Sequence, residues 1–317
     1  MHVATLASFW PRAPLPGKLG TMAPRAMVLG AGLGTRLRPL TFELPKPLVP
    51  IGDRPLLGHI ARRLARAGFD ELVVNTHHLP TAFSSLDQTL GVRLHRVHEP
   101  VIRGTAGGVA GARALLGAPP IVLWNGDILV DPPLAEMLAL AAGGGLVLAI
   151  QPRPAGQGTV GVDGAGSVVR LRGEGFGEEV RGGDYVGVAA LGARCLATLP
   201  EVGCLVGDWA LPELRSGGAV HTVEVQGGFD DAGDPAAYLR LNLTWLRATA
   251  APAFLGEGAV VGAGVELDEA VIGAGARVEG RGVVRRVVAW PGSVVRAPLS
   301  DAIVTTAGRV VQIRQST

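Results

Sequence analysis

Short apolar runs alternate with helix-like patterns between residues 26 and 246, and this alternation constrains the fold more than any other feature of the chain. The predicted strands are Met27–Leu29, Leu72–Val74, Val92–Val97, Ile121–Leu123 and Leu146–Ile150. The predicted helices are Leu56–Gly68, Thr105–Leu116 and Pro133–Ala142. The pattern predicts an α/β fold with a Rossmann-like, doubly wound, mostly parallel sheet covered on both faces. Ligands of such sheets bind beyond the carboxyl ends of the strands.

The C-terminal region has a different pattern, which begins after the small-residue segment Ala248–Pro252. Aliphatic residues recur at a six-residue step, at Leu255, Val261 and Leu267 and again at Ile272 and Val278. Such hexapeptide repeats form short parallel strands stacked into coils, with the aliphatic side chain inside. We therefore expect a short left-handed β-helix of two to three coils, and a small antiparallel β-domain is the alternative.

The length of 317 residues suits two domains, because single cores seldom grow beyond about 250 to 300 residues. We expect an extension over residues 1–24, an α/β domain over 25–247 and the β-helix over 253–317. Met22 offers a second translation start, so the extension is expected to be dispensable. Prolines interrupt the early apolar residues and no run of about 18 apolar residues occurs, which argues against a signal peptide or a membrane span.

Charge and cysteine content exclude further classes of protein. The formal net charge of +2 is too small to predict a nucleic-acid-binding surface. Cys195 and Cys204 lack the clustered spacing of a zinc site or a disulfide scaffold. We expect a cytoplasmic protein with neither a nucleic-acid nor a membrane partner.

Three glycines lie within five residues directly after the first predicted strand, in the segment Leu29–Arg36. Glycine lets backbone N–H groups approach a phosphate closely, so the segment predicts a phosphate-binding loop. A dinucleotide fingerprint would place its third glycine at Thr35, and the prolines that follow prevent a long helix there. No Gly-Lys-Ser/Thr of phosphate-loop kinases occurs. Arg36, Arg38 and Lys46 follow, and three cations beside a glycine loop suit a triphosphate.

The lysine in this loop is unusual for the chain. Of the 29 basic residues only Lys18 and Lys46 are lysine. An ammonium is a compact point charge, and a planar guanidinium does not replace it at a tight phosphate site. Lys46 is therefore a candidate phosphate contact, and chance retention of one lysine is the alternative.

The loop resembles the signature of the sugar nucleotidyltransferases, also called nucleoside-diphosphate-sugar pyrophosphorylases. The string from Gly30 to Thr41, followed by Pro45-Lys46-Pro47, is similar to that signature nearly residue for residue, with Gly30 in place of a more usual alanine. The resemblance implies that Arg36 holds the triphosphate and that Lys46 contacts phosphate near the reacting centre.

Further matches extend the resemblance over about residues 25 to 245. Glu99 and Gly104–Gly108 resemble the family's base-recognition stretch, although Thr105 could instead cap a helix. The resemblance implies that the nucleotide is bound by Leu29, Gly30, Ala31, Gly32, Gly34, Thr35, Arg36, Glu99, Gly104, Thr105 and Ala106.

Two aspartates resemble the family's metal ligands, and they imply Mg²⁺ as the cofactor. Asp127 ends the string Trp124-Asn125-Gly126-Asp127, and Asp231 lies in a second motif that departs from the family pattern at Phe229, Ala232 and Asp234. Asp131 and Asp230 are alternative ligands. The implied catalytic residues are Arg36, Lys46 and Asp127.

The sugar-binding region departs most from the family, because the usual Glu-Lys-Pro element is missing. Glu174 or Glu178 could supply its glutamate, and Arg170, Arg172 or Arg181 could lie near the sugar phosphate. The residues assigned to sugar binding are Asn125, Gly126, Glu174 and Gly187.

The reaction implied by the resemblance joins a nucleoside triphosphate to a sugar-1-phosphate and releases pyrophosphate. The Asn125-Gly126-Asp127 form and the C-terminal repeats resemble the branch that uses GTP and mannose-1-phosphate, while thymidylyl and uridylyl transfer stay open. The alternatives are a non-catalytic regulatory paralogue that binds nucleotide sugar and a bifunctional acyltransferase, although the last histidine, His221, precedes the repeats. A glycosyltransferase would leave the loop from Gly30 to Pro47 unexplained.

An exposed β-helix would need capping or pairing, so we expect a homo-oligomer.

Overall fold

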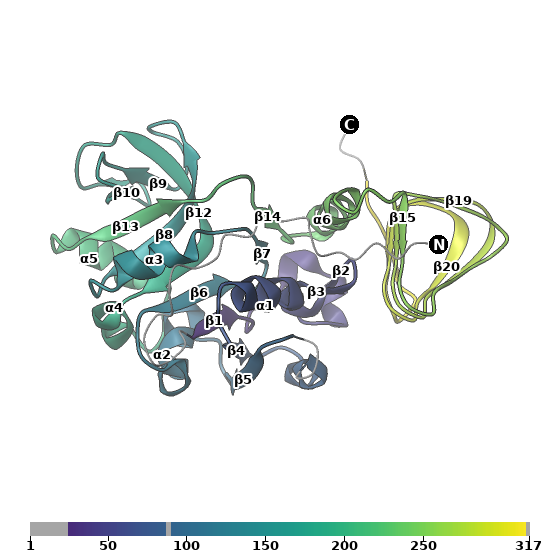
Figure 1. Cartoon of the computed structure of the whole chain (residues 1–317), viewed down its shortest axis with the longest axis horizontal. Coiled ribbons are helices and arrows are strands. Elements are labelled where there is room, and N and C mark those ends of the chain that lie inside the picture. The colour runs from purple at the N-terminus through teal and green to yellow at the C-terminus, as the bar shows by residue number, and fades with distance from the viewer. Residues whose placement is uncertain (1–24, 87–89, 315–317) are drawn as a thin grey trace. The chain divides into compact units, whose positions relative to one another are not determined.

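The computed structural model describes residues 25–86 and 90–314 (Figure 1), so the predicted extension over residues 1–24 lies outside the described residues. The described chain divides into two compact units. One unit contains residues 25–33 and 57–230, and the other contains 34–56 and 231–314. The domain boundaries expected at residues 25–247 and 253–317 stay a prediction. No helix in the described part of the chain has both the length and the apolar character needed to cross a membrane.

The first unit is built on a sheet with the strand order β11-β10-β9-β12-β6-β1-β4-β5, and β8 pairs with both β12 and β13. Its strands are β1 Ala26–Leu29, β4 Glu71–Thr76, β5 Arg93–His98, β6 Ile121–Asn125, β7 Ile128–Leu129, β8 Leu146–Arg153, β9 Val160–Val162, β10 Val168–Leu171, β11 Glu174–Gly175, β12 Arg181–Leu191 and β13 Val220–Glu224. Its helices are α1 Leu56–Arg66, α2 Gly104–Leu116, α3 Leu134–Ala141, α4 Ala193–Thr198 and α5 Leu211–Arg215, with a 3-10 helix at Pro80–Leu86 and a π-helical turn at Leu205–Ala210.

The predicted strands and helices are confirmed, and β6, β1, β4 and β5 run parallel. The sequence did not show that β12 runs antiparallel to β6, β8 and β9, so the sheet is parallel in one half and largely antiparallel in the other. Both faces of β1 are covered. Met27 packs with α2 in one cluster, while its neighbours Ala26 and Val28 on the opposite face are equally buried. α3 packs on β8, β12 and β13.

The second unit is dominated by stacked parallel strands, labelled in part in Figure 1. Its strands are β2 Pro50–Ile51, β3 Arg54–Pro55, β15 Ala253–Leu255, β16 Val260–Val261, β17 Gly264–Asp268, β18 Ala270–Ile272, β19 Arg277–Ala289, β20 Val294–Val304 and β21 Val310–Gln312. Its helix α6 spans Pro235–Arg247, and 3-10 helices lie at Thr35–Leu37, Leu40–Phe42 and Lys46–Leu48. The short β14, Asp230–Asp231, lies where the chain passes between the units.

The parallel pairs of the stack recur at a constant sequence spacing. Ala253 pairs with Ala270, and Val260 pairs with Arg277, each seventeen positions on. Because these pairs are parallel, the antiparallel alternative is wrong for β15 to β20. β21 then pairs antiparallel with β20 and ends the stack. The left-handed sense of the coils stays a prediction.

The repeated aliphatic residues form the core of this stack. Ile272 and Val278 are almost fully buried, whereas Leu255 is 50% exposed. Leu255 lies in β15, whose partner in the stack is β18. A strand at the end of a stack has a neighbouring strand on one side only. An aliphatic side chain at a repeat position is therefore fully buried only when strands lie on both sides of it.

Residues 34–56 pack on α6 and the stack. The Tyr238 hydroxyl donates to the Pro50 carbonyl oxygen at 2.5 Å and accepts from Trp290 Nε1 at 2.9 Å. The Glu43 carboxylate accepts hydrogen bonds from the Thr305 hydroxyl and the Ala307 N–H. The segment that contains Lys46 is therefore held by residues about 190 to 260 positions later in the sequence.

Candidate active site

The predicted phosphate loop begins at Gly30, directly after β1. Its N–H donates to Asn75 Oδ1 at 2.8 Å, and a Cβ at this position would lie 2.7 Å from the Asn75 carbonyl oxygen. Alanine would not fit here without a backbone shift, so the packing around β1 in this chain requires glycine at position 30. Ala31 is buried, but Gly32 is exposed, and a Cβ there would meet no described atom within 4 Å. The backbone at Gly32 is thus open to a ligand.

Gly34 has a different local environment, in the second unit. Its φ of +59° is the left-handed conformation that favours glycine. The Thr41 hydroxyl donates to the Gly34 carbonyl oxygen at 2.9 Å, and a Cβ on Gly34 would lie 2.7 Å from Thr41 Cγ2 and 3.4 Å from Lys46 Cβ. Gly34 therefore allows the chain to fold back closely enough to bring Thr41 and Lys46 against the start of this segment.

The two predicted catalytic cations differ in their surroundings. Arg36 is exposed and forms no ion pair with a residue that the structure describes, and Thr35 beside it is also exposed. The Lys46 side chain is only 11% exposed, and its Nζ lies 3.5 Å from Asp231 Oδ1. The side chain of Arg38 stacks on Phe42 at 5.3 Å from the ring centroid. Arg36 is thus the most available cation of the three.

Glu99 is buried, and both of its carboxylate oxygens are engaged. Asn75 Nδ2 donates to Oε1 at 2.7 Å, and the Arg103 N–H donates to Oε2 at 3.2 Å. Only 3% of Glu99 is exposed. The residue predicted to contact the nucleotide therefore forms part of an internal hydrogen-bond chain that begins at Gly30.

The predicted base-recognition stretch forms the first turn of α2, where residues 201–205 lie against it. Ala106 N–H donates to the Gly203 carbonyl oxygen at 2.9 Å, and a Cβ on Gly104 would lie 2.4 Å from that oxygen. Thr105 does not cap α2: its hydroxyl accepts from the Leu205 N–H at 2.7 Å. The glycines of this stretch allow close internal packing.

The carboxyl end of β6 brings predicted sugar-binding residues together. The Gly126 N–H donates to the Leu29 carbonyl oxygen at 3.0 Å, which joins this end of β6 to the end of β1. Gly187 of β12 has a φ of +75°, and a Cβ there would lie 2.7 Å from Asn125 Nδ2. Asn125, Gly126 and Gly187 therefore cluster, and their role in sugar binding stays a prediction.

Glu174 lies in the short hairpin strand β11, where it pairs with Arg215 through two hydrogen bonds. The Arg215 guanidinium holds the pKa of Glu174 below its usual range by hydrogen bonding. The Glu174 side chain is 42% exposed. Its role in sugar binding stays a prediction.

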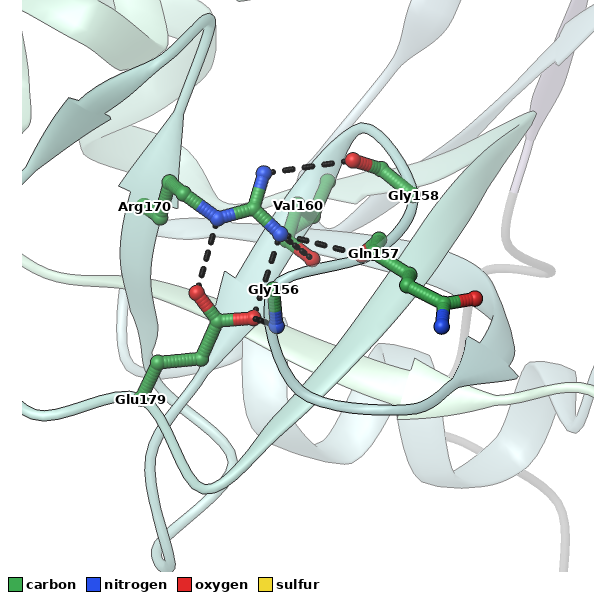
Figure 2. Close-up of polar contacts among 6 residues, drawn as sticks. All are labelled: Gly156, Gln157, Gly158, Val160, Arg170 and Glu179. Carbon is green, nitrogen blue, oxygen red and sulfur yellow. Dashed lines mark hydrogen bonds and ion pairs between the residues drawn. The ribbon is translucent and has the colours of Figure 1, made fainter.

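Arg170, the first candidate for the sugar phosphate, lies in the closed network that Figure 2 shows. Its Nε donates to Glu179 Oε2 at 2.7 Å, and its Nη2 donates to Glu179 Oε1 at 3.1 Å and to the Gln157 carbonyl oxygen at 2.9 Å. Nη1 donates to the Gly158 carbonyl oxygen at 3.2 Å, and Glu179 also accepts from the Gly156 N–H at 2.7 Å. Arg170 thus fixes the turn after β8.

Other arginines from the sugar-phosphate prediction also have partners. Arg181 pairs with Glu224 at 2.8 Å, and Arg172 lies 3.8 Å from Cys204 Sγ. Asp184 of β12 pairs with Arg153 at 2.7 Å. These pairs support the antiparallel half of the sheet and do not identify a replacement for the missing family lysine.

The side chains that could act as metal ligands show whether the described residues suit Mg²⁺. Within residues 25–86 and 90–314, no group of three or more His, Cys, Asp or Glu residues forms a metal site by itself. Mg²⁺ in nucleotide enzymes commonly uses one or two carboxylates with substrate phosphates and water. Asp127 and Asp231 are each of this donor type, and their assignment to one ion stays a prediction. Asp131 and Asp230 both act on Arg63 and oppose the lowering of its pKa by burial. They stay alternative ligands.

Sequence reasoning missed Asn75, Arg103 and the segment 201–205. Asn75 carries a weak signal, since it is a polar residue near the end of the apolar strand beside β1. Nothing in the sequence indicates that residues 201–205 pack against the start of α2, because this contact joins residues about 100 positions apart.

Comparison with known proteins gives a consistent result. Residues 25–172 match the model of the family described as nucleotidyl transferase. The chain is 37% identical over 116 residues to mannose-1-phosphate guanylyltransferase of Mycobacterium tuberculosis, covering 36% of this chain and 32% of that protein. It is 40% identical over 111 residues to N-acetylmuramate alpha-1-phosphate uridylyltransferase of Neisseria meningitidis, covering 34% of this chain and 48% of that protein. These alignments span between a third and half of the relatives' length.

Solved structures support the fold. HddC from Yersinia pseudotuberculosis superposes with a TM-score of 0.59 and 20% identity, over 70% of this chain and 99% of that chain. At this identity the similarity establishes the Rossmann-like α/β fold and nothing about the substrate.

Proposed function

We propose that this chain, whose residues 25–172 match the nucleotidyl transferase family, joins a nucleoside triphosphate to a sugar-1-phosphate and releases pyrophosphate. The observation that carries the proposal is the open glycine backbone at Gly32, followed four residues later by the exposed cation of Arg36, which pairs with no acidic side chain among the described residues. A loop of this kind after the first parallel strand suits a polyphosphate.

The chemistry is an in-line attack by a sugar-phosphate oxygen on the α-phosphorus of the triphosphate, with pyrophosphate as the leaving group. Both reactants are anions, so catalysis consists of reducing their repulsion and aligning the nucleophile with the leaving group. Arg36 would hold the leaving pyrophosphate and Lys46 would hold the α-phosphate. Asn125, Gly126 and Gly187 would orient the sugar at the end of β6.

Asp127 and Asp231 would hold Mg²⁺, which supplies charge neutralisation at the phosphates when it is bound. In the protein alone, Lys46 lies beside Asp231, so this carboxylate also keeps the ammonium in place. Asp231 would thus serve both the ion and the lysine.

The finer assignment is GTP with mannose-1-phosphate or a related sugar. It is supported by the Asn125-Gly126-Asp127 form and by the printed name of the Mycobacterium tuberculosis relative. The name of the Neisseria meningitidis relative supports uridylyl transfer as the alternative. Pyrophosphate release from each of the four ribonucleoside triphosphates and from dTTP, against a panel of sugar-1-phosphates, tests both assignments.

The metal assignment has its own test, in Asp127→Asn and Asp231→Asn. Each change keeps size and removes one negative charge, so we expect turnover to fall by about a thousandfold or more, at about tenfold for each 1.36 kcal/mol of lost transition-state stabilisation. Circular dichroism controls for folding. Near-normal turnover of Asp127→Asn at low Mg²⁺ would contradict the assignment, whereas normal turnover of Asp231→Asn alone would leave a single carboxylate ligand.

We also propose a homo-oligomer that uses the stacked strands. Aliphatic side chains on the stack are exposed, among them Leu255 at 50% and Val260 at 57%. Sedimentation of the full chain at micromolar concentration tests this, and a monomer would contradict it.

A further inference from the structure

We propose that Asn75 and Glu99 are positioning residues that hold the two ends of the nucleotide site in register through one hydrogen-bond chain. This inference rests on the proposed function, because it takes Gly30 as part of the phosphate loop and the start of α2 as the base side. The chain runs from the Gly30 N–H through the Asn75 amide and the Glu99 carboxylate to the Arg103 N–H.

The direction of each bond is fixed by chemistry. Both ends of the chain are backbone N–H donors, at Gly30 and Arg103. Asn75 accepts at its oxygen and donates from its nitrogen, while an ionised Glu99 can only accept. Each Glu99 oxygen therefore has one donor, and the two side chains leave neither backbone donor unsatisfied.

Burial makes this arrangement sensitive to change. Asn75 is 2% exposed and Glu99 is 3% exposed, so solvent cannot easily replace a lost partner. A buried polar group that loses its hydrogen bond bears the full cost of its desolvation. A change at either residue should therefore move a backbone segment.

Two glycines make room for the pair. A Cβ on Gly108 would lie 2.7 Å from Asn75 Nδ2 and 3.0 Å from Glu99 Oε1. A Cβ on Gly30 would lie 2.7 Å from the Asn75 carbonyl oxygen. The start of the glycine loop thus lies against Asn75, and the glycine-rich start of α2 lies against the side chains of both Asn75 and Glu99. A displacement at one end should therefore reach the other end through these two buried side chains.

The alternative is a buried network that supports the fold but does not position the nucleotide. The two differ in a measurable way. A positioning pair affects the KM of the nucleoside triphosphate more than that of the sugar-1-phosphate, because Gly30 and Gly104, which follows Arg103, belong to the proposed nucleotide site. A purely structural pair lowers the melting temperature and affects both substrates equally.

An exchange of the two functional groups tests the hydrogen-bond chain directly. In Asn75→Asp two carboxylates face each other without a donor, and in Glu99→Gln the side chain has one acceptor for two donors. The double variant Asn75→Asp/Glu99→Gln can restore every bond. Its carboxylate at position 75 would accept from the Gly30 N–H and from the amide at position 99, and the oxygen of that amide would accept from the Arg103 N–H. Only the central bond is reversed.

We expect each single variant to raise the KM of the nucleoside triphosphate about tenfold, or about 1.4 kcal/mol, and the double variant to return it to within about threefold of wild type. Glu71→Gln is the matched control. Glu71 lies at the opposite end of the same strand β4, where it pairs with Arg25, Arg93 and His95. The same change from carboxylate to amide there should leave the KM unchanged.

The nucleotide-induced rise in melting temperature is measured in parallel, because it requires binding but not turnover. A wild-type chain that neither releases pyrophosphate nor is stabilised by any triphosphate would overturn the proposed function. A wild-type chain that binds and turns over, with a double variant no better than the worse single variant, would overturn the positioning role alone. Equal KM effects on both substrates would likewise contradict it.

Discussion

The Tyr238 hydroxyl should contribute strongly to the stability of the unit formed by residues 34–56 and 231–314. It donates to the Pro50 carbonyl oxygen and accepts from Trp290 Nε1, and both aromatic side chains are fully buried. Tyr238→Phe removes this oxygen and leaves the indole N–H without an acceptor, which costs about 1–3 kcal/mol. The Pro50 oxygen loses its shorter bond, at about 0.5–1.5 kcal/mol, but keeps a contact with Asn242 Nδ2 at 3.4 Å. We expect a total loss of about 1.5–4.5 kcal/mol.

Urea unfolding of the full chain followed by circular dichroism gives the change in stability, and hydrogen exchange locates it. The Gly52 N–H is bonded to Asn242 Oδ1 at 2.9 Å, so peptides that contain Gly52 should lose protection, while peptides from β1 and β4 should not. Burial also raises the pKa of Tyr238, so the effect should not change in mildly alkaline buffer. In a cycle with Trp290→Phe the double variant should cost less than the sum of the singles. A Tyr238→Phe variant within about 0.5 kcal/mol of wild type, with unchanged exchange, would refute the reasoning.

Three further outcomes are expected. Lys46→Arg should lose turnover as severely as Lys46→Gln in pyrophosphate assays, because the Lys46 side chain is only 11% exposed and its Cβ lies close to Gly34, which leaves little room for a guanidinium. An active Lys46→Arg would contradict this. Arg170 holds the pKa of Glu179 below its usual range by hydrogen bonding. The ion pair therefore stabilises the fold at pH values above the ordinary carboxyl pKa, and this stabilisation is lost as the pH falls through the lowered pKa of Glu179. Glu179→Gln should therefore destabilise the chain at neutral pH and progressively less below about pH 4.5, as urea unfolding at several pH values would reveal, and a pH-independent difference would argue against the ion pair. Burial raises the pKa of Cys195 to about 12, so iodoacetamide at about pH 8 should modify Cys204 in the folded chain and spare Cys195, as peptide mass spectrometry can check.

The elements of the sheet were predictable because their signals are local. β1, β4, β6 and β8 are apolar runs whose residues are almost all buried, and α2 has the length and spacing of a helix. Strand direction is not a local property. Nothing in the composition of β12 distinguishes a strand that runs antiparallel to β6 from one that runs parallel to it.

Long-range contacts limited the prediction of the candidate site in the same way. The loop from Gly30 to Pro47 was identified from its glycines and cations, but its division between two compact units depends on partners such as Thr305 and Tyr238. Asn75 was missed because its role depends on hydrogen bonds to Gly30 and Glu99, which are distant in the sequence.

The structure also separates the glycines that packing explains from those that it does not. Gly104 and Gly108 read equally well in sequence as backbone that approaches a nucleobase, yet each has an internal neighbour closer than 3 Å to the position of a Cβ. Gly34 has such a neighbour and a left-handed φ as well. Gly32 has neither, and its surroundings among the described residues leave space for a side chain that the sequence does not use. Since glycine also costs conformational entropy in folding, its presence at Gly32 needs a reason outside the folded chain. We propose the close approach of a phosphate as that reason, because Gly32 lies in the predicted triphosphate loop.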